Sequence, residues 1–146
     1  QDHLMRLPLF RVWTHFSDST VKDMCSDESI VCRFLQESDE IFSAGALCHE
    51  AFHLMHGTVR YTQEPDSAMI AKTAWQDVSG KTWMCEAALW TTWFHVGRAE
   101  AMTKCTLVSL PAERVLDMLR THRLLRQITV SYGHEYHRRI LAARPP

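Results

Sequence analysis

Short apolar and β-branched runs recur at roughly regular intervals between positions 30 and 110, with polar turns or glycines between them. This spacing predicts antiparallel strands arranged as a barrel, sandwich or roll. Two of the runs, at 51–55 and 58–62, flank His56-Gly57 and predict a hairpin with a tight turn. Other strands are expected at 29–35, 40–43, 68–75, 82–84, 99–105 and 107–110.

Both ends of the chain have a helical pattern instead. Near the start, Leu7, Phe10 and Trp13 recur at helical spacing. After Leu110 a helix begins at Pro111, which suits a first helical turn. A second apolar stripe follows at helical spacing, and we expect Gly133 to bend or fray it. The stripe comprises Leu124, Leu125, Ile128, Tyr132, Tyr136 and Ile140.

The pattern as a whole predicts a mainly β domain with flanking helices. We expect an eight-stranded antiparallel β-roll, similar to a jelly roll, with N-terminal helices and two C-terminal helices. Residues 1–146 form one domain in this interpretation. Its parts are N-terminal helices at 1–28, the β-roll at 29–110 and C-terminal helices at 111–142.

Length and composition agree with a globular domain. The 146 residues are 46% hydrophobic and 23% charged, which excludes a disordered chain. No apolar run reaches the ~18 residues of a membrane span, and no leader sequence opens the chain. Because the first residue is Gln1, we expect a segment of a longer polypeptide.

The net charge of -1 conceals an uneven distribution. Residues 1–66 hold 11 acidic and five basic residues, whereas 67–146 hold six and 11. The basic excess follows the C-terminal helices, where it favours a solvated or partner-facing surface over a nucleic-acid site. These arginines are Arg114, Arg120, Arg123, Arg126, Arg138, Arg139 and Arg144.

The cysteines indicate reduced, buried thiols in an intracellular protein. Their number is odd and no CxxC pair occurs, so a disulfide framework is not expected. Nothing in the sequence supports thiolate catalysis. The five are Cys25, Cys32, Cys48, Cys85 and Cys105.

One segment matches the zinc-peptidase motif HExxH. On a helix, His49 and His53 would bind one zinc ion and Glu50 would act as general base. On a strand the two histidines would lie roughly 13 Å apart, too far for one ion. The surrounding runs favour a strand, so a zinc hydrolase is kept only as the alternative from another functional class.

A second candidate site combines a glutamate with an arginine. Glu86 lies where a strand passes into a short helix, whose free backbone N–H groups suit a phosphate. The carboxylate can accept a hydrogen bond from a ribose hydroxyl. Arg98, twelve residues later, can bind phosphate oxygens through its guanidinium.

Around this pair the sequence resembles the cyclic nucleotide-binding domain family, nearly from end to end. The residues at 4–10 resemble the family's leading helix, and 50–59 resemble its "E-x-aromatic-x-I-x-x-G-x-V" strand pair. Cys85-Glu86-Ala87-Ala88-Leu89 resembles the Gly-Glu-x-Ala-Leu start of the phosphate-binding cassette, and Gly97-Arg98-Ala99 resembles its arginine. The residues at 104–119 resemble the last strand and the following helix.

The resemblance implies a role for each matching residue. Glu86 would bind the ribose 2′-hydroxyl, the N–H groups of Ala87 and Ala88 would meet the phosphate, and Arg98 would be its counter-ion. Ala99 stands where Thr or Ser favours cGMP, so cAMP is the expected ligand. The final helix, around Tyr132 and Tyr136, would close over the base.

Three features depart from the family's pattern. Cys85 replaces the cassette glycine, the interval from Glu86 to Arg98 is about three residues longer than usual, and Glu100 stands close to the arginine. The lengthened stretch is bulky and aromatic. Its side chains and those of the final helix are expected to contact the base or to fill the pocket: Trp90, Trp93, His95, Tyr132 and Tyr136.

The expected function is therefore a non-catalytic ligand-sensing regulatory domain. It would bind a cyclic nucleotide and relay this event through the C-terminal helices to a fused channel or kinase, or to a partner protein. The alternative within this fold is a degenerate domain with a self-filled pocket that acts as an interaction module. We expect a cytoplasmic location, no cofactor, no resident metal, no nucleic acid and no membrane insertion by this segment.

Overall fold

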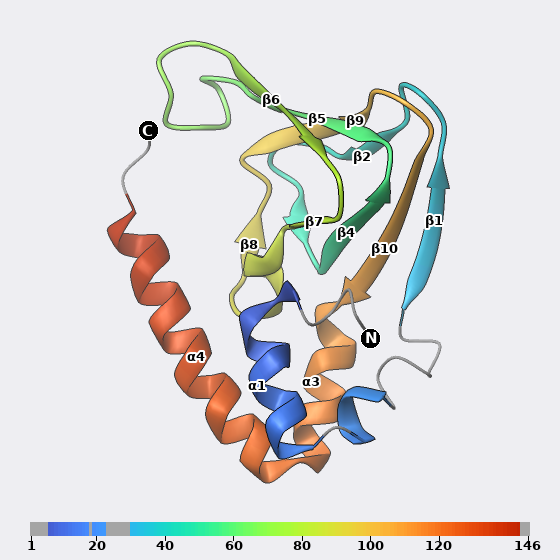
Figure 1. Ribbon diagram of the computed structural model, residues 1–146. Helices are drawn as coiled ribbons and strands as arrows, with labels where there is room; N and C mark the ends of the chain where they lie inside the picture. Colours follow the sequence, from blue (N-terminus) through green and yellow to red (C-terminus); the bar gives the residue numbers. More distant parts are fainter. Residues whose placement is uncertain (1–5, 18, 23–29, 144–146) are drawn as a thin grey trace.

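The computed structural model describes residues 6–17, 19–22 and 30–143 (Figure 1). Its centre is two four-stranded antiparallel sheets, with strand orders β1-β10-β4-β7 and β2-β9-β5-β6. These eight strands confirm the predicted β-roll with flanking helices. They are β1 (Val31–Leu35), β2 (Glu40–Phe42), β4 (Glu50–His56), β5 (Thr58–Gln63), β6 (Ala74–Ser79), β7 (Thr82–Met84), β9 (Gly97–Ala101) and β10 (Cys105–Pro111).

Two further strands form a small ribbon of their own. β3 (Leu47–Cys48) pairs with β8 (Trp93–Phe94), so that Cys48 lies opposite Trp93. The short 310-helix η2 (Glu86–Leu89) precedes β8 in the chain. This ribbon and η2 together position the candidate site.

The predicted hairpin around Gly57 is wrong. β4 pairs with β10 and β7, whereas β5 pairs with β6 and β9. The chain therefore turns a corner at Gly57 and passes from one sheet into the other. Gly57 has a φ of 96°, and a Cβ there would lie 2.5 Å from Cys105 Sγ and 2.6 Å from the Lys104 carbonyl oxygen. The corner thus requires glycine.

The strand predicted at 68–75 is also wrong for most of its length. The strand β6 begins at Ala74, and a loop occupies the residues before it. In that loop the Glu64 carbonyl accepts hydrogen bonds from the backbone N–H groups of Ser67 and Ala68. Because these residues satisfy one another locally, the apolar letters at 68–71 do not join a sheet.

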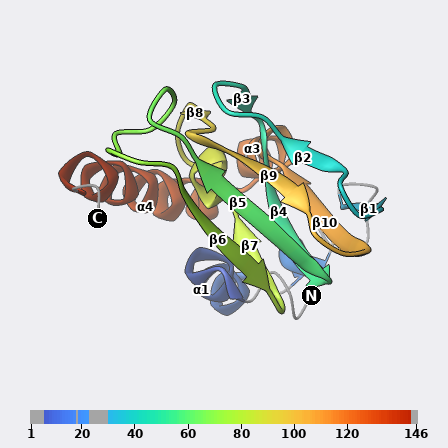
Figure 2. The same cartoon turned by 90° about the horizontal axis from the view of Figure 1, so that it is seen from above.

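In the described part of the chain, the helices that flank the roll include α1 (Pro8–Phe16), η2, α3 (Ala112–Thr121) and α4 (Arg123–Ala142). Residues 19–22 are also helical. Of the predicted N-terminal helical region 1–28, residues 1–5, 18 and 23–28 lie outside the described residues, and so does Cys25. The helices gather at one end of the roll, and α4 extends along its side (Figures 1 and 2).

The expected interruption of the last helix at Gly133 does not occur, because α4 is continuous through it. A glycine costs about 1 kcal/mol in a helix interior, and contacts of the preceding turn of α4 with the rest of the domain compensate. Trp13 Nε1 of α1 donates a 3.1 Å hydrogen bond to Thr129 Oγ1, which is buried. The Tyr132 hydroxyl donates to Glu86.

The core has two parts. One lies between the helices and the end of the roll, and the other lies inside the roll. The first includes Leu9, Phe10, Trp13, Leu110, Val115 and Leu125. The second includes Phe42, Phe52, Leu54, Val59, Ala99 and Leu107.

Candidate functional site

The side chains of the roll, of η2 and of α4 enclose a cavity of about 350 Å³. Aromatic and aliphatic groups dominate its wall, and among the described residues Glu86 is the one carboxylate that lines it. The lining residues are Phe42, Tyr61, Val78, Met84, Cys85, Glu86, Ala87, Trp93, His95, Val96, Tyr136 and Ile140.

Glu86 opens η2 and connects the cavity to the final helix. Its Oε1 accepts hydrogen bonds from Trp90 Nε1 at 3.2 Å and from the Tyr132 hydroxyl at 3.1 Å. Burial, together with the negative charge of Glu86, raises the pKa of Tyr132. The phenol therefore stays protonated at neutral pH and acts as a donor.

The two alanines after Glu86 are buried. Ala87 lines the cavity, whereas the N–H of Ala88 donates to the Cys85 carbonyl at 3.0 Å within the 310-helix. Of the two N–H groups expected to meet a phosphate, that of Ala88 therefore already has a hydrogen-bond partner in the protein.

Cys85, which by resemblance replaces the family's glycine, adopts the backbone that glycine favours. Its φ is 61° and its ψ is 28°, in the left-handed region. For a residue with a Cβ, this conformation costs about 1–2 kcal/mol. The tight turn before η2 is therefore retained despite the side chain.

Arg98 lies on β9 outside this cavity. Its side chain is half exposed and lies 3.6 Å from the Glu100 carboxylate and 4.0 Å from that of Glu64. It is not among the residues that line the cavity. The next residue, Ala99, is fully buried in the interior of the roll.

His95 lines the cavity and is one of the residues expected to contact the base or to fill the pocket. It stands three residues before Arg98, and three is the excess counted between Glu86 and Arg98. Its ring is buried, and this burial lowers its pKa. It stacks on Phe42, with ring centroids 3.8 Å apart and planes 7° apart.

The other predicted aromatic contacts divide into two groups. Trp93 and Tyr136 line the cavity. Trp90 packs in the helical core instead, 6.2 Å from Phe10 and 5.5 Å from Tyr132 between ring centroids. Tyr132 acts through its hydroxyl on Glu86.

A cluster of two thiols and one imidazole lies beside the same cavity, and Cys85 and His95 of this cluster also line it. Cys48, Cys85 and His95 hold their ligand atoms within 4.8 Å of one another. A hydrogen bond from the Cys85 thiol lowers the pKa of Cys48, and the same contact with burial raises that of Cys85.

The arrangement needed for the zinc-peptidase motif is not formed. Glu50 begins β4, His53 lies within this strand, and His49 directly precedes it. His49 is exposed, whereas His53 is fully buried with its ring 5.1 Å from Trp83. Glu50 is engaged by Arg33 at 2.5 Å. Because a strand separates the two histidines, the zinc hydrolase alternative is wrong.

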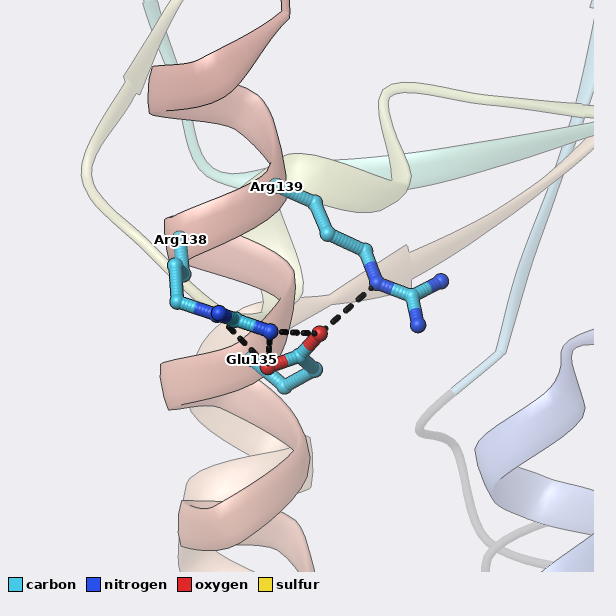
Figure 3. Close-up of polar contacts among 3 residues, drawn as sticks. All are labelled: Glu135, Arg138 and Arg139. Atoms are coloured by element: carbon cyan, nitrogen blue, oxygen red, sulfur yellow. Dashed lines mark hydrogen bonds and ion pairs between the residues drawn. The ribbon is translucent and has the colours of Figure 1, made fainter.

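The outer face of α4 carries part of the basic excess in paired form. Glu135 accepts hydrogen bonds of 2.9 Å from both Arg138 and Arg139 (Figure 3). These two guanidinium groups lower the pKa of Glu135 to about 2.

Within the described residues, we find no helix with the length and apolar character of a membrane span.

No family model matches the sequence, and no curated protein matches it either. Solved structures do match. The N-terminal domain of a transcriptional regulator from Streptomyces coelicolor A3(2) superposes with a TM-score of 0.72 at 17% identity, over 96% of this chain and 92% of that one.

Two further solved structures are similar. The C-linker/CNBHD of zELK channels, crystallized in the presence of cAMP, gives a TM-score of 0.68 at 16% identity, over 90% of this chain and 62% of that one. A cyclic nucleotide-binding-like protein from Brucella abortus gives 0.66 at 17% identity, over 82% and 96%. The element order and the corner between the sheets agree with the fold of these similar structures. The chain therefore has the fold of cyclic nucleotide-binding domains.

Proposed function

We propose that this chain is a non-catalytic regulatory domain whose roll cavity binds a cyclic nucleotide, cAMP before cGMP, and whose α4 transmits the binding event. The observation that carries the proposal is the hydrogen bond from Tyr132 on α4 to Glu86 at the cavity. It links a carboxylate of the cavity wall directly to the helix that closes the cavity through Tyr136 and Ile140.

The wall of the cavity suits a nucleoside better than a phosphate. Glu86 can accept from ribose hydroxyls, and the rings of Phe42, Tyr61 and Trp93 offer surface to a purine. The names of the similar structures support a cyclic nucleotide as the ligand class, and Ala99 after the arginine supports cAMP by resemblance.

The phosphate would depend on a small set of donors. No lysine or arginine lines the cavity within the part of the chain that the structure describes, so the N–H of Ala87 and the imidazole of His95 are the nearest candidates. Arg98 would serve as counter-ion only after leaving Glu64 and Glu100. We therefore expect weaker binding than an arginine in the wall would give, since charge-assisted hydrogen bonds are the stronger ones.

The mechanism follows from competition at Glu86. A ligand hydroxyl that bonds to Oε1 displaces the Tyr132 hydroxyl and frees α4 at this point. This coupling is reciprocal. A partner that stabilises the Tyr132–Glu86 contact weakens ligand binding by the same factor by which the ligand weakens binding of that partner. The partner is a fused channel or kinase, or a separate protein, at a cytoplasmic location.

Calorimetry with cAMP and cGMP tests the proposal. We expect cAMP to bind the wild type more tightly than cGMP, and Glu86→Gln to weaken it at least about tenfold, which is ~1.4 kcal/mol. His95→Ala and Arg98→Ala form a matched pair. The loss in His95→Ala should exceed that in Arg98→Ala. No heat of binding up to about 1 mM of either nucleotide would overturn the nucleotide proposal.

One observation favours a second candidate, an interaction domain with a self-occupied pocket. Glu86 already accepts two hydrogen bonds, and Arg98 is already paired with carboxylates. In that case the helical surface would be the functional part. It exposes about half of each of three apolar side chains: Leu116, Leu124 and Val130. Absence of nucleotide binding together with an intact fold would support this candidate.

A further inference from the structure

We propose that Cys48, Cys85 and His95 form a binding site for a zinc ion in the wall of the roll. This site goes beyond the proposed nucleotide function and does not depend on it. It is also unrelated to the HExxH segment, whose residues lie in and beside β4.

The three residues come from two adjoining pieces of backbone. Cys48 ends β3, and His95 directly follows β8, its partner strand in the ribbon. Two backbone hydrogen bonds fix His95 against this ribbon: its N–H donates to the Ala46 carbonyl at 2.9 Å, and its carbonyl accepts from the Gly45 N–H at 2.7 Å. Cys85 is supplied by the turn that opens η2.

The distances suit one tetrahedral ion. Zn–S bonds of about 2.3 Å and Zn–N bonds of about 2.0–2.1 Å place the donor atoms of a tetrahedral site about 3.5–3.8 Å apart. Cys85 Sγ lies 3.7 Å from His95 Nδ1. All three donor atoms lie within 4.8 Å of one another, so shifts of about 1 Å or less complete the geometry.

The donors are held before any ion binds. The His95 ring stacks on Phe42 at 3.8 Å, which fixes its plane. The Cys48 thiol contacts the Glu50 carbonyl at 3.3 Å and is 5% exposed. Cys85 keeps its left-handed backbone with its side chain in the cavity wall, although a glycine there would avoid the steric cost. A metal–thiolate bond would compensate for this cost.

The donor set selects the metal. Two thiolates and one imidazole suit a borderline-soft ion such as Zn²⁺, and they do not suit Mg²⁺ or Ca²⁺, which take oxygen ligands. Binding of Zn²⁺ releases two thiol protons to solvent, and the resulting two thiolates, ion and neutral imidazole carry no net charge. A neutral complex avoids the large cost of a buried charge. Water completes the fourth position.

Cobalt and zinc titrations of the reduced protein test this site without any nucleotide. We expect one Co²⁺ per chain with thiolate-to-cobalt charge-transfer absorption, displaced by one equivalent of Zn²⁺. Cys48→Ala and His95→Asn should each weaken Zn²⁺ at least about 100-fold, more than the loss of an outer-shell group. The matched control is Cys105→Ala, which removes another buried thiol that bonds only to backbone carbonyls and should keep full affinity.

Two designs separate this proposal from the nucleotide proposal. Cys48 is not a lining residue of the main cavity, so Cys48→Ala should lose zinc and keep any nucleotide binding. Glu86→Gln should do the reverse. Folding of each variant is checked by circular dichroism, and a zinc-induced rise in unfolding temperature provides a second readout in the wild type alone.

The zinc proposal is overturned if the reduced wild type binds neither ion. It is also overturned if Cys48→Ala and His95→Asn, both folded, bind as tightly as the wild type. A disulfide between Cys48 and Cys85 that persists in excess reductant would overturn it as well, because the thiolates would then be unavailable.

Discussion

The Tyr132 hydroxyl on α4 donates a 3.1 Å hydrogen bond to Glu86 Oε1 on η2, across 46 residues of sequence. This contact joins the last helix to the first residue of the short helix beside the cavity. Trp90 donates to the same oxygen from within the helical core. A single carboxylate oxygen thus connects cavity, core and α4.

Removing the Tyr132 hydroxyl should weaken the attachment of α4 to η2 and leave the roll intact. We expect Tyr132→Phe to lower the free energy of unfolding by about 1 kcal/mol, since one hydrogen bond to a partly solvated carboxylate is lost. Amide hydrogen exchange should speed up at 130–142 more than in β4 or β10. Tyr136→Phe is the control, because no hydrogen bond to Glu86 is lost. Equal exchange in both variants would contradict the role given to Tyr132.

Tyr132→Phe should also increase the affinity of the domain for its ligand. With Tyr132 unable to donate, a ligand hydroxyl no longer competes for Glu86 Oε1, and cAMP affinity should rise about fivefold to tenfold, or ~1–1.4 kcal/mol. Calorimetry on Tyr132→Phe and wild type measures this. A fall in affinity would show that Tyr132 acts by contact with the ligand instead of by competition.

The left-handed residue before η2 provides a comparison within one position. Cys85→Gly and Cys85→Ala both remove the thiol, but only glycine relieves the strain of a φ of 61°. Glycine also gains entropy in the unfolded chain, which offsets part of the relief. We expect the free energy of unfolding of Cys85→Gly to exceed that of Cys85→Ala by about 1 kcal/mol, so that the glycine variant unfolds at a higher urea concentration. The order would reverse if the turn relaxed in the alanine variant.

The link between α1 and α4 is a buried polar pair. Thr129 Oγ1 accepts from Trp13 Nε1 at 3.1 Å and donates to the Leu125 carbonyl at 2.7 Å. Thr129→Val keeps the shape and leaves the buried indole N–H without an acceptor, which costs about 1–3 kcal/mol. Urea denaturation measures the loss. Thr121→Val, at an exposed threonine that donates to the Met118 carbonyl, should change stability by less than half as much.

The ion pairs of Glu135 with Arg138 and Arg139 should make an acid-sensitive contribution to the free energy of unfolding. Its folded pKa of about 2 lies below the ordinary value of 4.5, so the unfolded state binds a proton first as the pH falls. The stabilisation is complete above about pH 4.5 and is lost as the pH approaches 2. Glu135→Gln should therefore flatten the acid limb of the stability profile. Because the group is exposed, added salt should reduce the difference.

The sequence predicted the elements and their class well, because strand and helix periodicities are local. Most of the paired strands and the helical ends follow from short apolar runs and from apolar stripes at helical spacing, whereas β6 begins only at Ala74, near the end of the run predicted as a strand. The hairpin at Gly57 failed because a glycine turn looks the same whether its two strands pair or separate into different sheets. Only the partners β10 and β9, which lie far along the chain, decide that question.

The candidate site was predictable in part. Glu86 and the final-helix tyrosines were expected near one another, and the structure brings Tyr132 to Glu86. Arg98 was chosen for its residue type, but its neighbours Glu64 and Glu100 hold it outside the cavity. The thiol cluster could not be foreseen, since Cys48 and Cys85 are far apart in the sequence and come together through the pairing of β4 with β7 and of β3 with β8.

The corner at Gly57 has a consequence for the history of this sequence. Any side chain there meets Cys105 and the backbone at Lys104, and it must also adopt a φ of 96°. Neither obstacle involves a ligand, so both persist whether or not the cavity keeps its function. Among descendants of this gene, Gly57 should be retained after Glu86, His95 and the thiols have drifted, and it would mark the fold in relatives that no longer sense anything.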